Sequence, residues 1–218
     1  MKKTVRPAIV DVVLLLPKTA EMKAAEQLAA KCVFTAIDFE TTGTVPGWPV
    51  EPWQIGLCEI SCEGGVTGGF SSLLGVSSDR PFNRFAPGRH ALIREELALS
   101  PTLPEIWDEL APRLVGIPLV AHNVGTERTM LRKAAPLHAL GPWIDTLKLS
   151  RIVAPGLASY ALGDVIAHFG LTAAVDAACP GLSAHDAYYD AVACGLLLMH
   201  FLSLPGWRGA TLGQLANA

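Results

Sequence analysis

Charge of either sign is scarce in this sequence. Only 17% of the 218 residues are charged, whereas 50% are hydrophobic, and the formal net charge is −3. This composition excludes a disordered chain and is typical of a globular domain with a sizeable core. The lack of positive charge also argues against a protein that grips long duplex nucleic acid electrostatically. It still permits a site that handles a short strand end with metal ions supplying the positive charge.

Cysteine is scarce as well, and long hydrophobic runs are missing. The five cysteines form an odd count without a zinc-type C-x-x-C pair. This pattern indicates free thiols in a reducing compartment, so we expect a cytoplasmic protein. Residues 1–16 imitate a secretory signal only faintly, because Asp11 interrupts their apolar part and charged residues follow at once. No run is long enough to span a membrane, and we expect no membrane partner.

The order of the expected elements predicts an α/β domain with a mixed sheet. Strands are expected at 32–37, 54–60, 67–74, 116–121 and 143–145. Helices are expected over 21–31, 102–114, 125–135, 160–169 and 184–202, with a capping box of Thr102 and Glu105 at the second of them. We divide the chain into an extension over 1–31, a domain over 32–204 and a tail over 205–218.

The most informative stretch is Phe34-Thr-Ala-Ile-Asp-Phe-Glu-Thr-Thr-Gly43. It begins as an apolar, β-prone run typical of a strand buried on both faces. Asp38 and Glu40 are two residues apart and therefore point to the same face of that strand. Two such carboxylates raise each other's pKa unless a cation lies between them, and a hard divalent ion such as Mg²⁺ or Mn²⁺ is the preferred partner. The alternative is a strand end whose two acids merely meet solvent.

A second segment, Leu119-Val-Ala-His-Asn-Val-Gly-Thr-Glu-Arg-Thr-Met-Leu131, joins a short buried strand to a helix. It carries His122 and Asn123 at the strand end and Glu127 in the first turn of the helix. Carboxylates are favoured in a first turn by the helix dipole, which is also the simpler explanation for Glu127.

A third segment, Ser183-Ala-His-Asp-Ala-Tyr-Tyr-Asp-Ala-Val-Ala193, opens the last long helix. Ser183 and Asp186 can form a capping box, which would put His185 in the first helical turn. A histidine near a helix N-terminus is disfavoured as the cation and is suited to act as a neutral base near pH 7. Asp190 lies among apolar residues and needs a partner. Alternatively, His185 is an ordinary surface histidine of a capping turn.

Together, D-x-E at a strand end, H-N-x-x-x-E and H-x-x-x-x-D resemble the three motifs of the DEDDh 3′–5′ exonucleases, a family that includes ribonuclease T and the proofreading subunit of bacterial replicative polymerase. The match covers residues 32–202. It is supported by Thr-Thr-Gly after Glu40, by Ile144-Asp-Thr-Leu147 and by His-x-Ala-x-x-Asp-Ala over 185–191. The resemblance implies a ribonuclease H-like fold, with a mixed five-stranded sheet flanked by helices.

The resemblance also implies a site with two Mg²⁺ or Mn²⁺ ions. Asp38 would bridge both ions, and Glu40 and Asp190 would bind the first. His185 would be the general base that deprotonates the attacking water. The groups implied to approach the terminal nucleotide are Thr41, Thr42, His122 and Asn123.

One position departs from the family pattern, since the second motif usually carries Asp where this chain has Glu127. The charge is kept, but one extra methylene moves it. In family members this carboxylate tends to reach the metal through water, so a longer arm is compatible with the same role.

The implied function is metal-dependent hydrolysis of phosphodiester bonds from the 3′ end of single-stranded DNA or RNA. The alternatives are a nucleic-acid-binding module that kept the fold and lost the chemistry, and an unrelated metal phosphohydrolase. The segment from Arg80 to Arg94 interleaves basic and aromatic residues, which suits a single strand. It also fits a solvated loop with Phe82 and Phe85 buried. The sequence does not identify a polymerase or repair partner.

Overall fold

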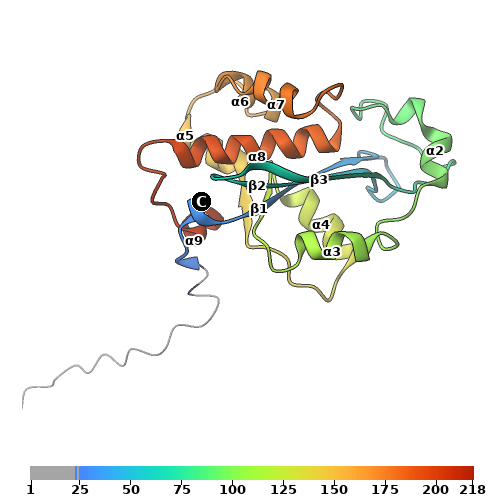
Figure 1. Ribbon diagram of the computed structural model, residues 1–218. Helices are drawn as coiled ribbons and strands as arrows, with labels where there is room; N and C mark the ends of the chain where they lie inside the picture. Colours follow the sequence, from blue (N-terminus) through green and yellow to red (C-terminus); the bar gives the residue numbers. More distant parts are fainter. Residues whose placement is uncertain (1–22, 24) are drawn as a thin grey trace, which may run out of the picture.

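The computed structural model describes residue 23 and residues 25–218, and its centre is a five-stranded sheet (Figure 1). The strand order is β3-β2-β1-β4-β5. β1 pairs antiparallel with β2 and parallel with β4, β2 pairs antiparallel with β3, and β4 pairs parallel with β5. The strands are β1 (Phe34–Thr41), β2 (Pro52–Ser61), β3 (Gly65–Leu73), β4 (Leu119–Ala121) and β5 (Trp143–Asp145). The predicted α/β class and the mixed five-stranded sheet are confirmed.

Helices cover both faces of this sheet, with α6, α7 and α8 on one side and α3 and α4 on the other (Figure 1). The α-helices are α2 (Arg94–Leu99), α3 (Trp107–Leu114), α4 (Gly125–Ala134), α5 (Thr146–Val153), α6 (Leu162–His168), α7 (Thr172–Ala178), α8 (Ala187–Ser203) and α9 (Leu212–Ala216). Two 3₁₀ helices, η1 (Ala29–Lys31) and η2 (His90–Leu92), complete the described elements.

β1 is the central strand, and its side chains alternate between two cores. Phe34 and Ala36 belong to the core under α8, whereas Ile37 and Phe39 belong to the core under α3 and α4. Because side chains alternate along a strand, the next two residues on the α8 side are the acids of the D-x-E motif. The near-continuous apolar sequence of β1 follows from burial on both faces.

α8 is the principal helix of its layer and is apolar on most of its circumference. It packs against β1, β2 and β3 on one side and against α6 and α7 on the other. A helix that is apolar all round is one that is buried between layers. The predicted helix over 184–202 is therefore present, but it begins at Ala187, because Asp186 is its N-cap and accepts a hydrogen bond from the backbone N–H of Tyr188.

Two other helix predictions differ from the structure. The helix expected over 102–114 begins at Trp107, and the Thr102 hydroxyl donates to the Glu105 carboxylate at 2.8 Å instead of capping a helix. Of the helix expected over 21–31, residues 21, 22 and 24 lie outside the described residues, and residues 23 and 25 are helical. Residues 26–28 are not helical, and η1 follows them.

The two ends of the described chain are paired with each other. The backbone N–H of Ala29 donates to Ala210 at 2.9 Å, and that of Leu212 donates to Gln27 at 2.9 Å. Leu212 and Leu215 of α9 are buried in the core under α8. Residues 205–218, the expected tail, thus pack against the domain. In the part of the chain that the structure describes, no helix has both the length and the apolar character needed to cross a bilayer.

Gly56 of β2 lies opposite Asp38 in the strand register and directly beneath the start of α8. A Cβ at this position would overlap the backbone of Ala187 and Tyr188. Glycine is thus required here so that the first turn of α8 can approach the sheet beside the D-x-E acids.

Replacing Gly56 with Ala is expected to destabilise the fold by about 1–3 kcal/mol, because the new methyl group has no space without displacing α8. The matched control is Gly163→Ala in α6, where an added Cβ meets nothing within 4 Å and the site is exposed. This control should be neutral or slightly stabilising. Urea denaturation of the three proteins measures both effects, and equal midpoints for Gly56→Ala and the parent would contradict the close approach.

Candidate active site

The C-terminal end of β1 carries the first two acids of the site. Asp38 is partly buried, and Glu40 is buried at 6% exposure. Both point to the α8 side of the sheet, as their spacing predicts. The register shifts between Glu40 and Thr41, which ends the regular pairing with β2 just past the acidic pair.

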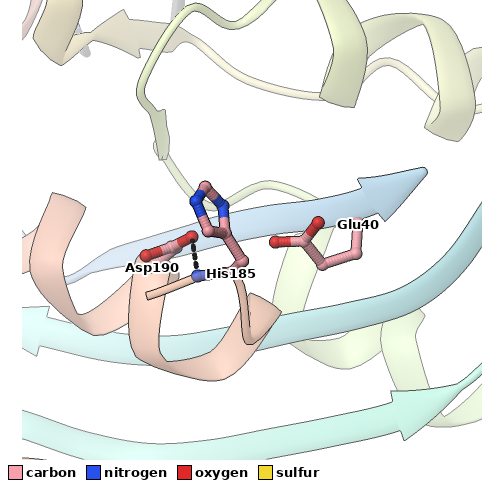
Figure 2. Close-up of side chains that lie close together, drawn as sticks. All are labelled: Glu40, His185 and Asp190. Atoms are coloured by element: carbon pink, nitrogen blue, oxygen red, sulfur yellow. Dashed lines mark hydrogen bonds between the residues drawn. The ribbon is translucent and has the colours of Figure 1, made fainter. Parts of the chain in front are cut away.

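The residues before and within the first turn of α8 complete one cluster. Ligand atoms of Glu40, His185 and Asp190 all lie within 4.8 Å of one another. Figure 2 shows the His185 ring beside the carboxylates of Glu40 and Asp190. The backbone N–H of His185 donates to Asp190 Oδ2 at 3.1 Å, which ties the loop before the helix to the helix itself.

The local geometry at His185 differs from the prediction. Asp186, not Ser183, caps α8, and His185 precedes the helix with φ of 68° instead of lying in its first turn. A positive φ is uncommon for a residue with a Cβ, and such strain persists only where surrounding contacts impose it. With this backbone conformation the imidazole of His185 points toward Glu40 (Figure 2). A helical backbone conformation at His185 would point the ring in another direction.

Glu127 reaches the site from the first turn of α4 on the other side of the cluster. Its side chain is buried at 3% exposure, and Oε2 has no hydrogen-bond partner among the described residues. A surface acid that only complements a helix dipole would be solvated. An unpartnered buried carboxylate oxygen instead favours a ligand that is polar or charged.

Burial and mutual repulsion raise the pKa values of all the carboxyl groups in this cluster. Burial raises the pKa of Asp38 well above its usual range, with further increases from the charges of Glu127, Asp190 and Glu40. Burial, then the nearby aspartates, raises the pKa of Glu40 to about 7. Burial raises the pKa of Glu127 to about 8. For Asp190, burial raises the pKa, and the hydrogen bond from His185 partly opposes this.

This donor set fits divalent metal ions. Carboxylate oxygens are the ligands that Mg²⁺ and Mn²⁺ prefer, and one imidazole nitrogen is compatible with Mn²⁺. A cation would offset the repulsion that raises these pKa values and would give the orphaned oxygen of Glu127 a partner, directly or through water. The residues that can hold it are Asp38, Glu40, Glu127, His185 and Asp190.

A cleft of about 320 Å³ opens beside the acids. Its walls include Asp38, Glu40, Thr41, Asn83, Phe85, His122, Asn123, Thr126 and Glu127. Asn123 is exposed there at a φ of 72°, a conformation that Asn tolerates better than most residues. Its backbone N–H donates to Asp145 Oδ1 at 3.0 Å, and the same oxygen caps α5 at Leu147. Asp145 thus fixes the turn that presents Asn123.

Two residues expected to approach a nucleotide are instead committed to internal contacts. Thr42 is fully buried, and its hydroxyl accepts from the backbone of Glu51 at 3.1 Å and from Arg80 Nη2 at 3.1 Å. The two ring nitrogens of His122 lie 3.0 Å from the Thr146 hydroxyl and 2.8 Å from the Tyr160 carbonyl. Both side chains therefore hold the walls of the cleft together. Thr41, which is partly exposed, and Asn123 remain open to it.

Gln54 is a site residue that the sequence reasoning missed. It lies opposite Glu40 in the β1–β2 register and is 2% exposed. Its Nε2 donates to Asp186 Oδ2 at 2.9 Å, and its Oε1 accepts from the backbone N–H of Ala187 at 3.4 Å. Gln54 thereby joins β2 to the N-terminus of α8. The available signal was a polar residue between the apolar Trp53 and Ile55, because a buried amide requires partners.

The segment from Arg80 to Arg94 divides into a buried part and an exposed part. Arg80 is 2% exposed and forms an ion pair with Glu51 at 2.7 Å, so it is structural. Phe85 is 77% exposed and lines the cleft, with the Arg84 guanidinium 4.5 Å from its ring centroid. The expectation of a buried Phe85 is therefore wrong, and the ring is free to contact a ligand.

The chain matches the family model described as RNase T exonuclease over residues 35–198. No curated protein matches the sequence. Among solved structures, an exonuclease X in complex with 5′-overhanging duplex DNA is 25% identical with a TM-score of 0.61, and the match covers 84% of this chain and 99% of that one. The ribonuclease H-like exonuclease fold expected from the motifs is confirmed.

Two more distant structures share this fold. The nuclease domain of 3′hExo, a DEDDh family member bound to rAMP, is 14% identical with a TM-score of 0.61, and the match covers 83% of this chain and 94% of that one. Pop2p of S. pombe, in a Mg²⁺- and Mn²⁺-bound form, is 15% identical with a TM-score of 0.56, and the match covers 78% of this chain and 82% of that one.

The raised carboxyl pKa values make the stability of the metal-free protein depend on pH. Glu40 and Glu127 ionise near 4.5 when unfolded but only near 7 and 8 when folded, so between these values the folded state binds more protons. The free energy of unfolding should therefore fall as the pH rises through this window. We expect Mn²⁺ to raise the melting temperature more at about pH 8.5 than at about pH 5.5. At the higher pH, fewer protons must be released from the carboxyl groups when the metal binds.

Thermal scans in chelator and in Mn²⁺ at both pH values measure this effect. Glu127→Gln is the control, since it removes one carboxyl group whose pKa is raised in the folded state. It should therefore weaken the dependence of the melting temperature on pH in chelator. A Mn²⁺-induced shift of equal size at both pH values would contradict metal binding by this cluster.

Proposed function

Because the chain belongs to the RNase T exonuclease family, we propose that its acidic cluster binds two Mg²⁺ or Mn²⁺ ions and cleaves nucleotides from single-stranded DNA or RNA. The enzyme is a 3′–5′ exonuclease of the DEDDh type. The observation that carries the proposal is the convergence of Glu40, His185 and Asp190, whose ligand atoms lie within 4.8 Å of one another. A cytoplasmic location belongs to the same proposal and is supported by five free cysteines.

The proposed metal ligands come from three elements. Asp38, Glu40 and Asp190 would hold the ions, because their carboxylates lie together at the end of β1 and the start of α8. Glu127 would add its charge to the same site from α4. The chemistry supplied by bound ions is Lewis-acid stabilisation of the charge that develops on the entering and leaving oxygens.

His185 is proposed to take the proton of the attacking water. Its side chain is exposed, and the hydrogen bond from its backbone N–H to Asp190 holds the backbone from which the imidazole extends beside Glu40. Gln54 supports this position indirectly, because it anchors the residue that follows His185. General-base catalysis requires such a fixed placement within hydrogen-bonding reach of water.

The cleft next to the acids is proposed to hold the 3′-terminal nucleotide. Phe85 offers an exposed ring on which a base can stack, a contact that is tolerant of sequence. Asn123 and Thr41 offer polar groups on the same cleft. This arrangement suits one unpaired strand end, since the cleft volume of about 320 Å³ is that of a small-ligand site.

A 5′-labelled oligonucleotide incubated with Mn²⁺ tests the function. The expected product is a ladder that shortens from the 3′ end and disappears in chelator. Asp38→Asn should abolish the ladder while leaving the fold intact, and His185→Ala should lower kcat by ~10²–10⁴-fold, as loss of a general base does. Binding of the oligonucleotide without shortening, under any metal condition, would contradict an enzymatic role and favour the binding module.

Glu127 provides a second test, because its longer side chain departs from the family pattern. If it acts through water, Glu127→Gln should reduce activity by ~10–100-fold, less than Asp38→Asn, and high Mn²⁺ should reduce the deficit. Glu127→Asp restores the usual length and should retain activity. A kcat unchanged in Glu127→Gln, with only a small change in melting temperature, would remove Glu127 from the active site.

A further inference from the structure

A second cleft, of about 370 Å³, lies on the solvent side of α4. Its basic side chains are Arg128, Arg132 and His138, and its apolar walls include Leu140 and Trp143. Val124 and Gly125 line this cleft, whereas the adjoining Asn123, Thr126 and Glu127 line the cleft beside the acids. The two clefts are therefore neighbours that share the start of α4.

The two arginines contrast with Arg80 and Arg113, each of which has an acidic partner. Arg80 pairs with Glu51 and Arg113 with Glu59. Among the residues that the structure describes, neither Arg128 nor Arg132 forms an ion pair, and both are exposed. They are four residues apart on one helix face, so their positions differ by about 6 Å along the helix axis. They thus present two successive cationic groups in a row.

The aromatic side of this cleft is held in place by packing. The His138 ring contacts Trp107 with a centroid separation of 5.0 Å. Gly141, at a φ of 107°, lies so close to Trp143 that an added Cβ would be 2.7 Å from the indole Cδ1. The row of free guanidinium groups therefore faces a fixed wall that contains an indole and an imidazole. Arginine on phosphates and rings beside bases is the combination that binds single-stranded nucleic acid.

We propose that this second cleft binds the strand upstream of the nucleotide being removed, with Arg128 and Arg132 on consecutive phosphates and the Trp143 side beside a base. The inference rests on the proposed function, because it places the 3′ end in the neighbouring acidic cleft. The acidic cluster repels phosphates until metal is bound, and the net charge of −3 supplies no general attraction. A local cationic row next to the site therefore provides the affinity for a longer strand.

The test compares Arg128→Gln/Arg132→Gln with a control that also removes two positive charges, Lys133→Gln/Lys31→Gln. Lys133 is exposed on the same helix but lines a different cleft, and Lys31 lies in η1. Binding of a fluorescent 12-nucleotide single strand with 3′ phosphorothioate linkages is measured at several salt concentrations with Mg²⁺ present. The slope of log Kd against log salt should fall by about 1.4 in the arginine variant, since each single-strand phosphate contact contributes about 0.7. The control should keep the slope of the parent.

Hydrolysis of the p-nitrophenyl ester of thymidine 5′-monophosphate separates this inference from the proposed function, because the ester has no upstream strand. Its kcat and KM should be the same in the parent and the arginine variant, while KM for a 12-nucleotide substrate rises in the variant. An inactive parent would refute the proposed function, whereas the salt slopes would still decide the second cleft. Equal slopes for the arginine variant and the control would overturn the inference. So would weaker binding of free thymidine 5′-monophosphate with an unchanged strand slope, since the cleft would then hold a released nucleotide.

Discussion

The structure depends on one unfavourable interaction, the repulsion among carboxylates that are brought together in a partly dehydrated cleft. Asp38 experiences the charges of four neighbouring acids in addition to the cost of burial. An isolated domain would gain stability by separating them. The rest of the fold instead holds them close, and strain of this kind is concentrated at functional sites.

The scaffold achieves this by placing the acids on its most rigid elements. β1 is paired on both sides and buried on both faces, so the positions of Asp38 and Glu40 are set by the sheet. α8 reaches the same point because Gly56 lets its first turn approach β2, and Gln54 joins that turn to the strand. The contribution of α4 is Glu127, which lies in its first turn and lines the cleft beside the acids. Repulsion is thus resisted by backbone placement and not by flexible side chains.

Much of this arrangement follows from the sequence, because strand alternation and helix periodicity are local rules. The five strands, the shared face of Asp38 and Glu40, and the proximity of the three motifs were all accessible in this way. The start of α8 could not be predicted in this way, since Ser183 and Asp186 are both good N-cap residues. Only the contact with Gln54 favours Asp186. Thr42 and His122 were expected to contact a nucleotide because they lie in segments that resemble the family motifs. Their hydrogen-bond partners Arg80 and Tyr160, however, are far away in the sequence. Such long-range partners leave no local trace in a sequence.

The pairing of the two chain ends has a consequence for how this domain can be joined to others. Residues 27–29 and 210–212 meet near the start of β1, and Asp38 and Glu40 lie toward the other end of that strand. At a rise of about 3.3 Å per residue, the two acids are roughly 13–20 Å from the first residue of β1. These two described segments therefore leave the sheet next to each other, at the end of β1 away from the acids. A polypeptide that is fused at this junction would therefore leave the cleft open to its substrate.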